Sequence, residues 1–244
     1  MTIKDTIRKY TNELKLVTHI PAKEVEILML HLLEKNTIWL HLNYNVEFEK
    51  EKELAILVKK RATNYPLEYI INKASFYGEM FIVKEGVLIP RPETEILVEN
   101  AVEILKDKKE NIKVLEIGTG SGIISVMLAM LIENIKIIAV DINEKALDLA
   151  KQNAIKHGVE NKIEFRLSNL YENINKNDIF MTISNPPYIA NNYKLPTNVK
   201  YEPSNALFGG VVGDELLKDI IKDKNEKKIP YLLCEMGYDQ KAPL

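Results

Sequence analysis

The chain has 244 residues, of which 46% are hydrophobic and 28% charged, and its formal net charge is −2. This composition is typical of a globular protein and argues against a strongly basic surface for nucleic acid or anionic membranes. The longest apolar stretch, residues 123–132, is too short to span a bilayer, and the polar N-terminus lacks the apolar core of a signal peptide. With Cys234 as its single cysteine, the sequence predicts a cytoplasmic protein without an internal disulfide bond.

Residues 1–66 are predicted to form a small N-terminal all-helical domain. Two sets of apolar residues recur at helical spacing: Val25, Leu28, Met29, Leu32 and Leu33 in the first, and Leu54, Leu57 and Val58 in the second. Pro21 suits the first position of a helix, and Pro66 follows the end of the second helix. Because basic and acidic residues nearly balance in this segment, we expect it to serve in packing or in recognising the shape of a partner.

Residues 67–92 are predicted to form a hairpin linker. The short runs 75–78 and 80–83 are rich in aromatic and apolar residues, which favour two β-strands joined by a turn. A helix is expected next, over residues 94–105. Glu93 and Glu95 lie in its first turn, where acidic side chains suit the helix dipole.

Residues 93–244 are predicted to form an α/β domain with a Rossmann-like, mostly parallel sheet. The expected strands are 114–117, 137–142, 163–167, 179–184 and 231–235, and the expected helices between them are 123–131, 145–157 and 216–221. The strands are apolar without alternation, which indicates a sheet covered on both faces by helices. Ligands of such sheets bind outside the carboxyl ends of the strands.

A glycine-rich turn separates the first of these strands from its helix; it consists of Gly118, Thr119, Gly120, Ser121 and Gly122. Glycines permit a sharp turn and close approach of a ligand, while the helix N-terminus presents free N–H groups. The spacing differs from G-x-G-x-x-G, which argues against a pyrophosphate site. By itself this turn is compatible with a dinucleotide site, a nucleoside site or only a tight turn.

Asp141 strengthens the case for a nucleoside site. It ends the second strand, about twenty residues beyond the glycines, where a carboxylate can accept hydrogen bonds from both ribose hydroxyls. The alternative role is to cap the following helix, which Asn143 can do instead. After the third strand, Asn169 can meet the adenine edge and Leu170 can pack on its ring, although both also suit a turn or a core position.

Asn185, Pro186, Pro187 and Tyr188 follow a predicted buried strand and form a rigid turn. The side-chain oxygen of Asn185 and the carbonyl of Pro186 are two acceptors at a fixed separation, which suits the two hydrogens of a planar amino group. Such hydrogen bonds, together with the ring face of Tyr188 near a growing positive charge, favour methyl transfer to an amide or an exocyclic amine. The structural alternative is a Pro-rich turn in which Asn is only a turn former.

In this order, the glycine-rich turn, Asp141 and residues 185–188 resemble the class I S-adenosylmethionine-dependent methyltransferases that act on planar amino groups. A wider set of segments resembles the HemK-like protein-(glutamine-N5) methyltransferases, and most closely their release factor branch. These segments are 76–78, 88–95, 202–203, 206–207 and 235–240. The resemblance covers nearly the whole chain.

The resemblance implies a class I methyltransferase fold with a helical N-terminal domain that recognises the substrate. It implies S-adenosyl-L-methionine as the cofactor and S-adenosyl-L-homocysteine as the product. The implied partner is a class-1 peptide chain release factor, methylated on the glutamine of its Gly-Gly-Gln loop, with no direct nucleic acid and no membrane. No metal is implied, and the four histidines and one cysteine show no ligand spacing.

The predicted site has a cofactor part and a substrate part. The cofactor part consists of Gly118, Thr119, Gly120, Ser121, Gly122, Asp141, Asn169, Leu170 and Asn185. The substrate part consists of Asn185, Pro186, Pro187 and Tyr188, of which Asn185, Pro186 and Tyr188 are the predicted catalytic residues. Three alternatives stay open: a ribosomal-protein glutamine methyltransferase of the same family, a nucleic-acid base methyltransferase, and a non-catalytic binding module.

Two departures from the family pattern lead to further expectations. The family usually has Asp followed by an aromatic residue where this chain has Asn169 and Leu170, so we expect weaker stacking on the adenine ring. The family also continues beyond the position of Leu244 with another helix and two closing strands. We therefore expect strand 231–235 to be an unpaired edge, and residues 1–244 to be marginally stable or to self-associate.

Overall fold

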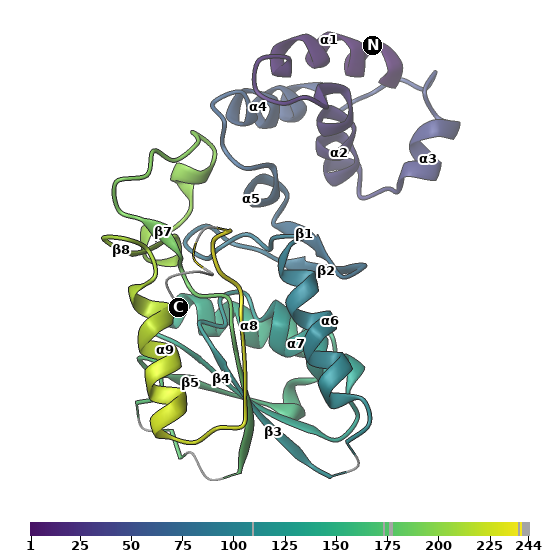
Figure 1. Cartoon of the computed structure of the whole chain (residues 1–244). Helices are drawn as coiled ribbons and strands as arrows, with labels where there is room; N and C mark the ends of the chain where they lie inside the picture. The colour runs from purple at the N-terminus through teal and green to yellow at the C-terminus, as the bar shows by residue number, and fades with distance from the viewer. Residues whose placement is uncertain (109, 173, 176–177, 239, 241–244) are drawn as a thin grey trace. The chain divides into compact units, whose positions relative to one another are not determined.

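The computed structural model describes residues 1–108, 110–172, 174–175, 178–238 and 240, so Asp239 and Leu244 lie outside the described residues (Figure 1). The chain divides into two compact units. The helical unit comprises Met1–Asn72 and Pro196–Tyr201, and the sheet unit comprises Lys73–Leu195 and Glu202–Leu244. The domain boundaries and domain roles expected from the sequence stay predictions.

The helical unit contains α1 (Ile3–Leu14), α2 (Pro21–Leu33), α3 (Thr37–Leu42), α4 (Glu51–Arg61) and α5 (Leu67–Ile71). Pro21 occupies the first turn of α2, as predicted. The side chains of Val25, Leu28 and Leu54 are wholly buried, which confirms both apolar stripes. The short helix α5 lies where the sequence predicted the start of the hairpin linker.

A buried ion pair joins α2 to α4. Arg61 donates from Nε to Glu24 Oε2 at 2.6 Å and from Nη2 to Glu24 Oε1 at 3.1 Å. Both side chains are less than a tenth exposed. Because removing one partner of a buried pair leaves the other charge without compensation, this contact fixes how the two helices pack.

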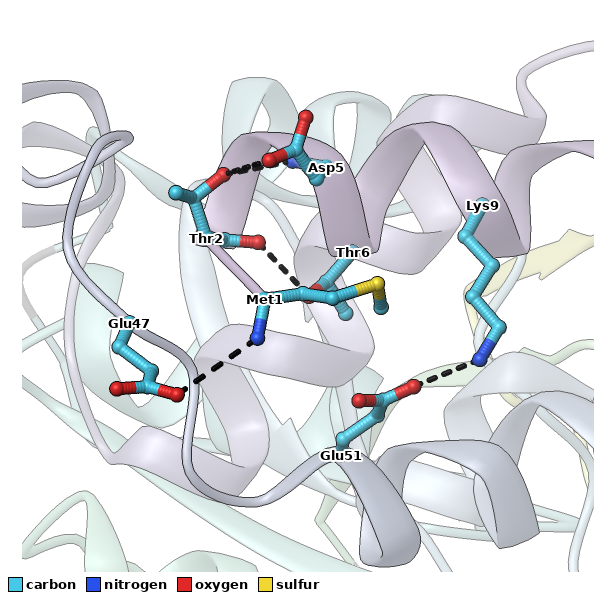
Figure 2. A network of polar contacts seen from close by, with 7 residues as sticks. All are labelled: Met1, Thr2, Asp5, Thr6, Lys9, Glu47 and Glu51. Carbon is cyan, nitrogen blue, oxygen red and sulfur yellow. Dashed lines mark hydrogen bonds and ion pairs between the residues drawn. The ribbon is translucent and has the colours of Figure 1, made fainter.

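Polar contacts also hold the beginning of α1, as Figure 2 shows. Thr2 caps the helix by accepting the Asp5 N–H at 3.1 Å, and its hydroxyl donates to the Asp5 carboxylate at 2.6 Å. Lys9 pairs with Glu51 of α4 at 2.7 Å. The Lys9 ammonium is half-exposed, so this surface pair contributes little to stability.

The sheet unit begins with the predicted hairpin, formed by β1 (Lys73–Phe76) and β2 (Glu79–Ile82). Tyr77 and Gly78 connect the strands with φ angles of 53° and 79°. Two successive residues at positive φ give the turn twist that matches a two-residue hairpin. The Tyr77 N–H donates to Glu95 Oε1 at 2.7 Å, which ties the turn to α6 (Thr94–Leu105).

The central sheet has five parallel strands in the order β5-β4-β3-β6-β9. They are β3 (Ile112–Ile117), β4 (Ile135–Asp141), β5 (Ile163–Leu167), β6 (Ile179–Ser184) and β9 (Tyr231–Cys234). Successive strand residues point to opposite faces, so Val114 belongs to one core cluster and Leu115 to the other. The predicted doubly covered parallel sheet is confirmed.

Helices cover both faces of this sheet (Figure 1). Side chains of α6, α7 (Ile123–Leu131) and α8 (Glu144–Lys156) share a core cluster with one face. Those of α9 (Glu215–Glu226) share a cluster with the other face. The chain passes from β5 at one edge to β6 on the far side of β3, so the strand order reverses between β3 and β6. Ligands of doubly wound sheets bind at this switch point.

Some elements differ from the sequence prediction. Helix α9 extends to Glu226 rather than to Ile221, because its last turns are polar and give no apolar signal. Two very short strands, β7 (Ile189–Ala190) and β8 (Phe208–Gly210), pair after the Asn-Pro-Pro-Tyr turn. Single 3₁₀ turns occur at η1 (Glu160–Lys162), η2 (Val199–Tyr201) and η3 (Ser204–Ala206).

Strand β9 lies at the edge of the sheet, where β6 is its partner among the described residues. Leu232, Leu233 and Cys234 are only partly buried. The expected marginal stability and self-association of this edge stay predictions. In the part of the chain that the structure describes, no helix combines the length and the apolar character that crossing a bilayer requires.

Candidate active site

A pocket opens at the carboxyl ends of β3, β4, β5 and β6. Seven residues of the predicted site line it: Gly118, Gly120, Asp141, Asn169, Leu170, Asn185 and Pro187. They lie at the ends of four different strands or in the loops that follow them. The fold therefore brings together the glycine-rich turn, the acidic strand end and the Asn-Pro-Pro-Tyr turn, as the sequence predicted.

The glycine-rich turn contributes backbone rather than side chains to the pocket. Gly118 and Gly120 have φ angles of +71° and +57°, and a Cβ on either would meet nothing within 4 Å. Thr119 and Ser121 are only 3% exposed and are not among the lining residues. A Cβ on Gly122 would lie 2.9 Å from the Ala150 Cβ, so this glycine permits α7 to pack against α8. The cofactor roles of Thr119, Ser121 and Gly122 stay predictions.

Beneath the turn lies Glu116, to which the sequence reasoning gave no role. Its side chain is 1% exposed and its Oε2 accepts from the hydroxyls of Thr119, at 2.8 Å, and Ser125. Among the described residues, Oε1 has no hydrogen-bond partner. Burial raises the pKa of Glu116 to about 7, against the hydrogen bonds that favour the charged form. The sequence does contain a signal for Glu116, because an acidic residue near the end of an otherwise apolar strand is unusual.

Asp141 is held by backbone amides at the end of β4. The N–H groups of Gly120 and Asn143 each donate to one of its carboxylate oxygens, both at 2.9 Å. Asn143 caps α8 by accepting the Lys145 N–H at 3.0 Å, so Asp141 does not serve as that cap. Burial raises the pKa of Asp141, while its backbone hydrogen bonds oppose the shift. Ile142 supplies a third backbone hydrogen bond, and because a carboxylate has about four acceptor sites, acceptor capacity remains for a ligand hydroxyl.

Asn169 and Leu170 lie on the loop after β5. Asn169 is exposed, and its Nδ2 lies 3.3 Å from Glu172 Oε1, which leaves its side-chain oxygen as an acceptor. Leu170 has a φ of 48° and packs partly on a core cluster. Ile142 is 59% exposed and lines the same pocket, although the sequence reasoning did not select it. An apolar residue beside a predicted ligand carboxylate is the signal that was missed.

Two further segments wall the pocket, namely 86–88 and 203–206. The carboxylate of Glu202 joins them. It accepts the Ile89 N–H at 3.0 Å and the Arg91 guanidinium at 2.6 Å, and its side chain is 2% exposed. Leu88, Pro203 and Ala206 belong to segments that carried the family resemblance, but the place of these two walls in the pocket was not predicted.

At the tip of β6, four side chains form a hydrogen-bonded network. Asn185 Nδ2 donates to Thr94 Oγ1 at 2.9 Å, and Thr94 Oγ1 donates to Glu235 Oε2 at 2.7 Å. The Tyr188 hydroxyl donates to Glu235 Oε1 at 3.2 Å. Burial and then the Glu235 charge raise the pKa of Tyr188 to about 12. Thr94 and Glu235 were missed because each lies far in sequence from the turn it supports.

Pro186 and Tyr188 do not line the pocket but stand beside it in the same turn. Pro186 is buried. Two glycines allow the neighbouring backbone to approach: a Cβ on Gly209 would lie 2.3 Å from the Pro187 oxygen, and one on Gly213 would lie 2.5 Å from the Tyr188 oxygen. The turn is therefore fixed by close backbone packing as well as by its prolines.

The residues present fit S-adenosylmethionine. Asp141 offers acceptors for a ribose diol, the glycines leave room for close approach, and Ile142, Leu170 and Val87 supply apolar walls. Asn185 brings an amide to the same pocket. The arrangement can bind a nucleoside and place an amino group next to it.

Comparison with known proteins identifies the family. Residues 92–201 match the model of the methyltransferase small domain, and residues 5–71 match that of the PrmC N-terminal domain. The release factor glutamine methyltransferase of Dictyoglomus turgidum is 42% identical over 81% of this chain and 71% of that protein. That of Aquifex aeolicus is 34% identical over 98% of this chain and 84% of that protein.

The chain belongs to the release factor glutamine methyltransferase family. It is 37% identical to the Fusobacterium nucleatum member over 90% of this chain but spans only 64% of that protein. The family consists of S-adenosylmethionine-dependent glutamine methyltransferases of release factors, so the family, the enzyme class and the cofactor predicted from the sequence are confirmed.

The solved structures agree on the fold. The catalytic domain of hMettl16 in complex with MAT2A 3'UTR hairpin 6 aligns with a TM-score of 0.56 at 17% identity, over 78% of this chain and 70% of that chain. At that identity the likeness shows the fold alone. The predicted class I methyltransferase fold is confirmed.

Proposed function

We propose that this chain methylates the side-chain nitrogen of the glutamine in the Gly-Gly-Gln loop of class-1 peptide chain release factors. The observation that supports it best is that Asn185 lines the same pocket as Asp141 and the glycine-rich turn. An amide acceptor thus lies next to the proposed nucleoside site. The relatives that identify the family are release factor glutamine methyltransferases.

The cofactor half of the site has separate tasks. Asp141 accepts the ribose hydroxyls, while Asn169 accepts from the adenine amine and Leu170 and Ile142 contact its ring. Gly118 and Gly120 let the ligand approach the backbone. When bound, S-adenosylmethionine supplies the methyl group on its sulfonium. The missing aromatic residue after Asn169 leaves apolar contact rather than stacking on one ring face.

The acceptor half orients the glutamine. Asn185 Oδ1 and the Pro186 carbonyl accept the two amide hydrogens, which aims the nitrogen lone pair at the methyl group. Tyr188 presents its ring near the nitrogen as positive charge grows there. Orientation of this kind contributes up to about 7–11 kcal/mol in well-aligned systems. The nitrogen loses a proton to solvent once it has been methylated, when that proton is acidic.

Substrate choice and location follow from the same proposal. The substrate is a translation protein, so the site of action is the cytoplasm, with no direct nucleic acid and no membrane. The helical segment 1–66 contributes to docking the release factor, which its match to the PrmC N-terminal domain supports. Two other methyl acceptors compete with this proposal: a glutamine of a ribosomal protein, and the amino group of a nucleic-acid base. The net charge of −2 counts against the base.

The decisive experiment offers all three acceptors. The chain is incubated with labelled S-adenosylmethionine and a class-1 release factor, ribosomes or RNA, and the products are mapped by mass spectrometry. We expect one methyl group on the loop glutamine and none on a factor whose loop glutamine is alanine. Methyl transfer to a ribosomal protein or a base, with the release factor left unmodified, would replace this proposal by the corresponding rival.

A further inference from the structure

We propose that Glu235, acting through Thr94, fixes which way the Asn185 amide faces and so makes this side chain an acceptor for the substrate. The inference rests on the proposed function, because it concerns how Asn185 recognises an –NH2 group. Thr94 and Glu235 are positioning residues: they touch Asn185 and Tyr188 rather than the reacting atoms.

The direction of each hydrogen bond follows from the chemistry of Glu235. An ionised carboxylate accepts hydrogen bonds and donates none. Its two oxygens take the hydroxyl hydrogens of Thr94, at 2.7 Å, and of Tyr188, at 3.2 Å. A hydroxyl has one hydrogen, so the Thr94 oxygen is left as an acceptor toward Asn185. It receives the Asn185 Nδ2–H at 2.9 Å.

This polarity sets the acceptor in the pocket. With Nδ2 turned to Thr94, the planar amide of Asn185 presents Oδ1 on its other side, and Asn185 lines the pocket. The flipped amide would present an –NH2 group to the –NH2 group of a glutamine, where two donors meet without an acceptor. Thr94 is 1% exposed, so water competes little for its oxygen.

The sheet explains why these side chains meet. Thr94 is the first residue of α6, while Glu235 follows β9 directly. The Glu235 N–H donates to the Ser184 carbonyl at 3.1 Å, which continues the β6–β9 pairing and sets Glu235 beside the Asn185 turn. The network therefore couples the acceptor turn to two elements distant in the chain.

The test changes the donors and acceptors of the network without removing a side chain from it. The amide introduced by Glu235→Gln fits in two ways. Its –NH2 group can donate to Thr94, which turns the Thr94 hydrogen to Asn185 and flips that amide; or its oxygen can accept from Thr94 while the –NH2 group donates to the Tyr188 hydroxyl, which keeps the wild-type polarity. We expect kcat to fall by up to about 10²-fold, the usual loss for one oriented polar group, with cofactor affinity unchanged by calorimetry. Asn185→Asp should also lose activity, because aspartate cannot donate to Thr94.

The double variant Asn185→Asp with Glu235→Gln distinguishes this inference from a merely structural role. There the introduced glutamine amide donates to Thr94, and the Thr94 hydroxyl donates to one oxygen of the introduced aspartate. The other oxygen of that aspartate faces the substrate as an acceptor. We expect the double variant to be at least about tenfold more active than Asn185→Asp alone, a non-additivity that two independent losses cannot give.

Matched variants complete the design. Glu99→Gln removes the same charge from an exposed position of α6 and should leave kcat unchanged. Thr94→Ser keeps the hydroxyl and should retain activity, whereas Thr94→Val should lose it; this pair carries the test if Glu235→Gln does not fold. A wild-type kcat in Thr94→Val, or a double variant no better than Asn185→Asp, overturns the inference. Failure of the wild-type enzyme to methylate a release factor would instead overturn the proposed function.

Discussion

The two halves of the site are built in different ways. The ribose-binding part of the cofactor half is local in sequence, since the glycine-rich turn, Asp141 and Asn143 lie within residues 118–143 and contact one another through backbone amides. The acceptor half depends on side chains 91 and 141 residues apart, which meet at Thr94. The cofactor half is thus specified by short motifs, whereas the acceptor half requires the whole sheet to be assembled.

The largest effect on methyl transfer is expected from a variant that changes the acceptor half alone. Asn185→Ala removes one of the two acceptors, so methyl transfer should fall by about 10²–10³-fold while cofactor affinity stays nearly unchanged. Single-turnover rates and calorimetry measure the two quantities. Asn191→Ala, an exposed asparagine in the same region, is the control. A comparable loss of cofactor affinity would mean that the two halves are not separate.

The second prediction concerns Glu116, which is buried against the glycine-rich turn of the cofactor half. Because the folded-state pKa of Glu116 is raised from 4.5 to about 7, the native state holds this proton more tightly than the unfolded chain does. The resulting stabilisation is complete below pH 4.5 and is lost as pH rises through 7. It amounts to roughly 3 kcal/mol, since one pKa unit corresponds to about 1.4 kcal/mol.

Denaturant unfolding at pH values from below 4.5 to above 7 measures this loss of stability. Glu116→Gln keeps the protonated shape, so its free energy of unfolding should decline less with pH than that of the wild type. Glu133→Gln, on an exposed position, should follow the wild type. Parallel curves for the wild type and Glu116→Gln would show that Glu116 does not titrate in this range.

The third prediction concerns Asp141, whose carboxylate lines the cofactor pocket. Asp141→Ala should weaken S-adenosylmethionine binding by about 1.5–3 kcal/mol, the usual contribution of hydrogen bonds to a charged group. Calorimetry measures it, with Asp148→Ala on the exposed face of α8 as the control. Unchanged affinity would remove Asp141 from the site.

The smallest effect is expected on the free energy of unfolding. It comes from a pair of glycine variants that distinguishes backbone strain from close packing in the glycine-rich turn. Gly122→Ala and Gly158→Ala both place a Cβ at positive φ, but only Gly122 has a neighbour, Ala150, at 2.9 Å. The free energy of unfolding should therefore fall further for Gly122→Ala, by about 1–3 kcal/mol, the usual cost of overpacking. Equal losses would mean that α7 shifts to accept the methyl group.

Much of the fold could be predicted because its signals are local. The apolar strands, the helix at Thr94–Leu105 and the hairpin turn at Tyr77 and Gly78 each follow from patterns within a few residues. The full length of α9 could not be predicted, since its polar end has no periodic signal. The pairing of β7 with β8 was also missed, because these strands are too short to show alternation.

The site divides in the same way. Gly118, Gly120 and Asp141 were selected from motif spacing, and all three line the pocket. Thr94 and Glu235 were not found, although both lie in segments that carried the family resemblance. Their role depends on which strand neighbours β6, and no pattern within either segment contains that information.

The Glu202 contact has a consequence for ligand entry. It links the segment 86–88 to the segment 203–206, and both border the cofactor pocket. A separation of the two segments at Glu202 would break its contacts with Ile89 and Arg91. If the Glu202–Arg91 pair helps to retain the cofactor by holding the two segments together, the bound cofactor must in turn stabilise that pair. The two effects are equal in free energy, because the coupling between two sites is reciprocal.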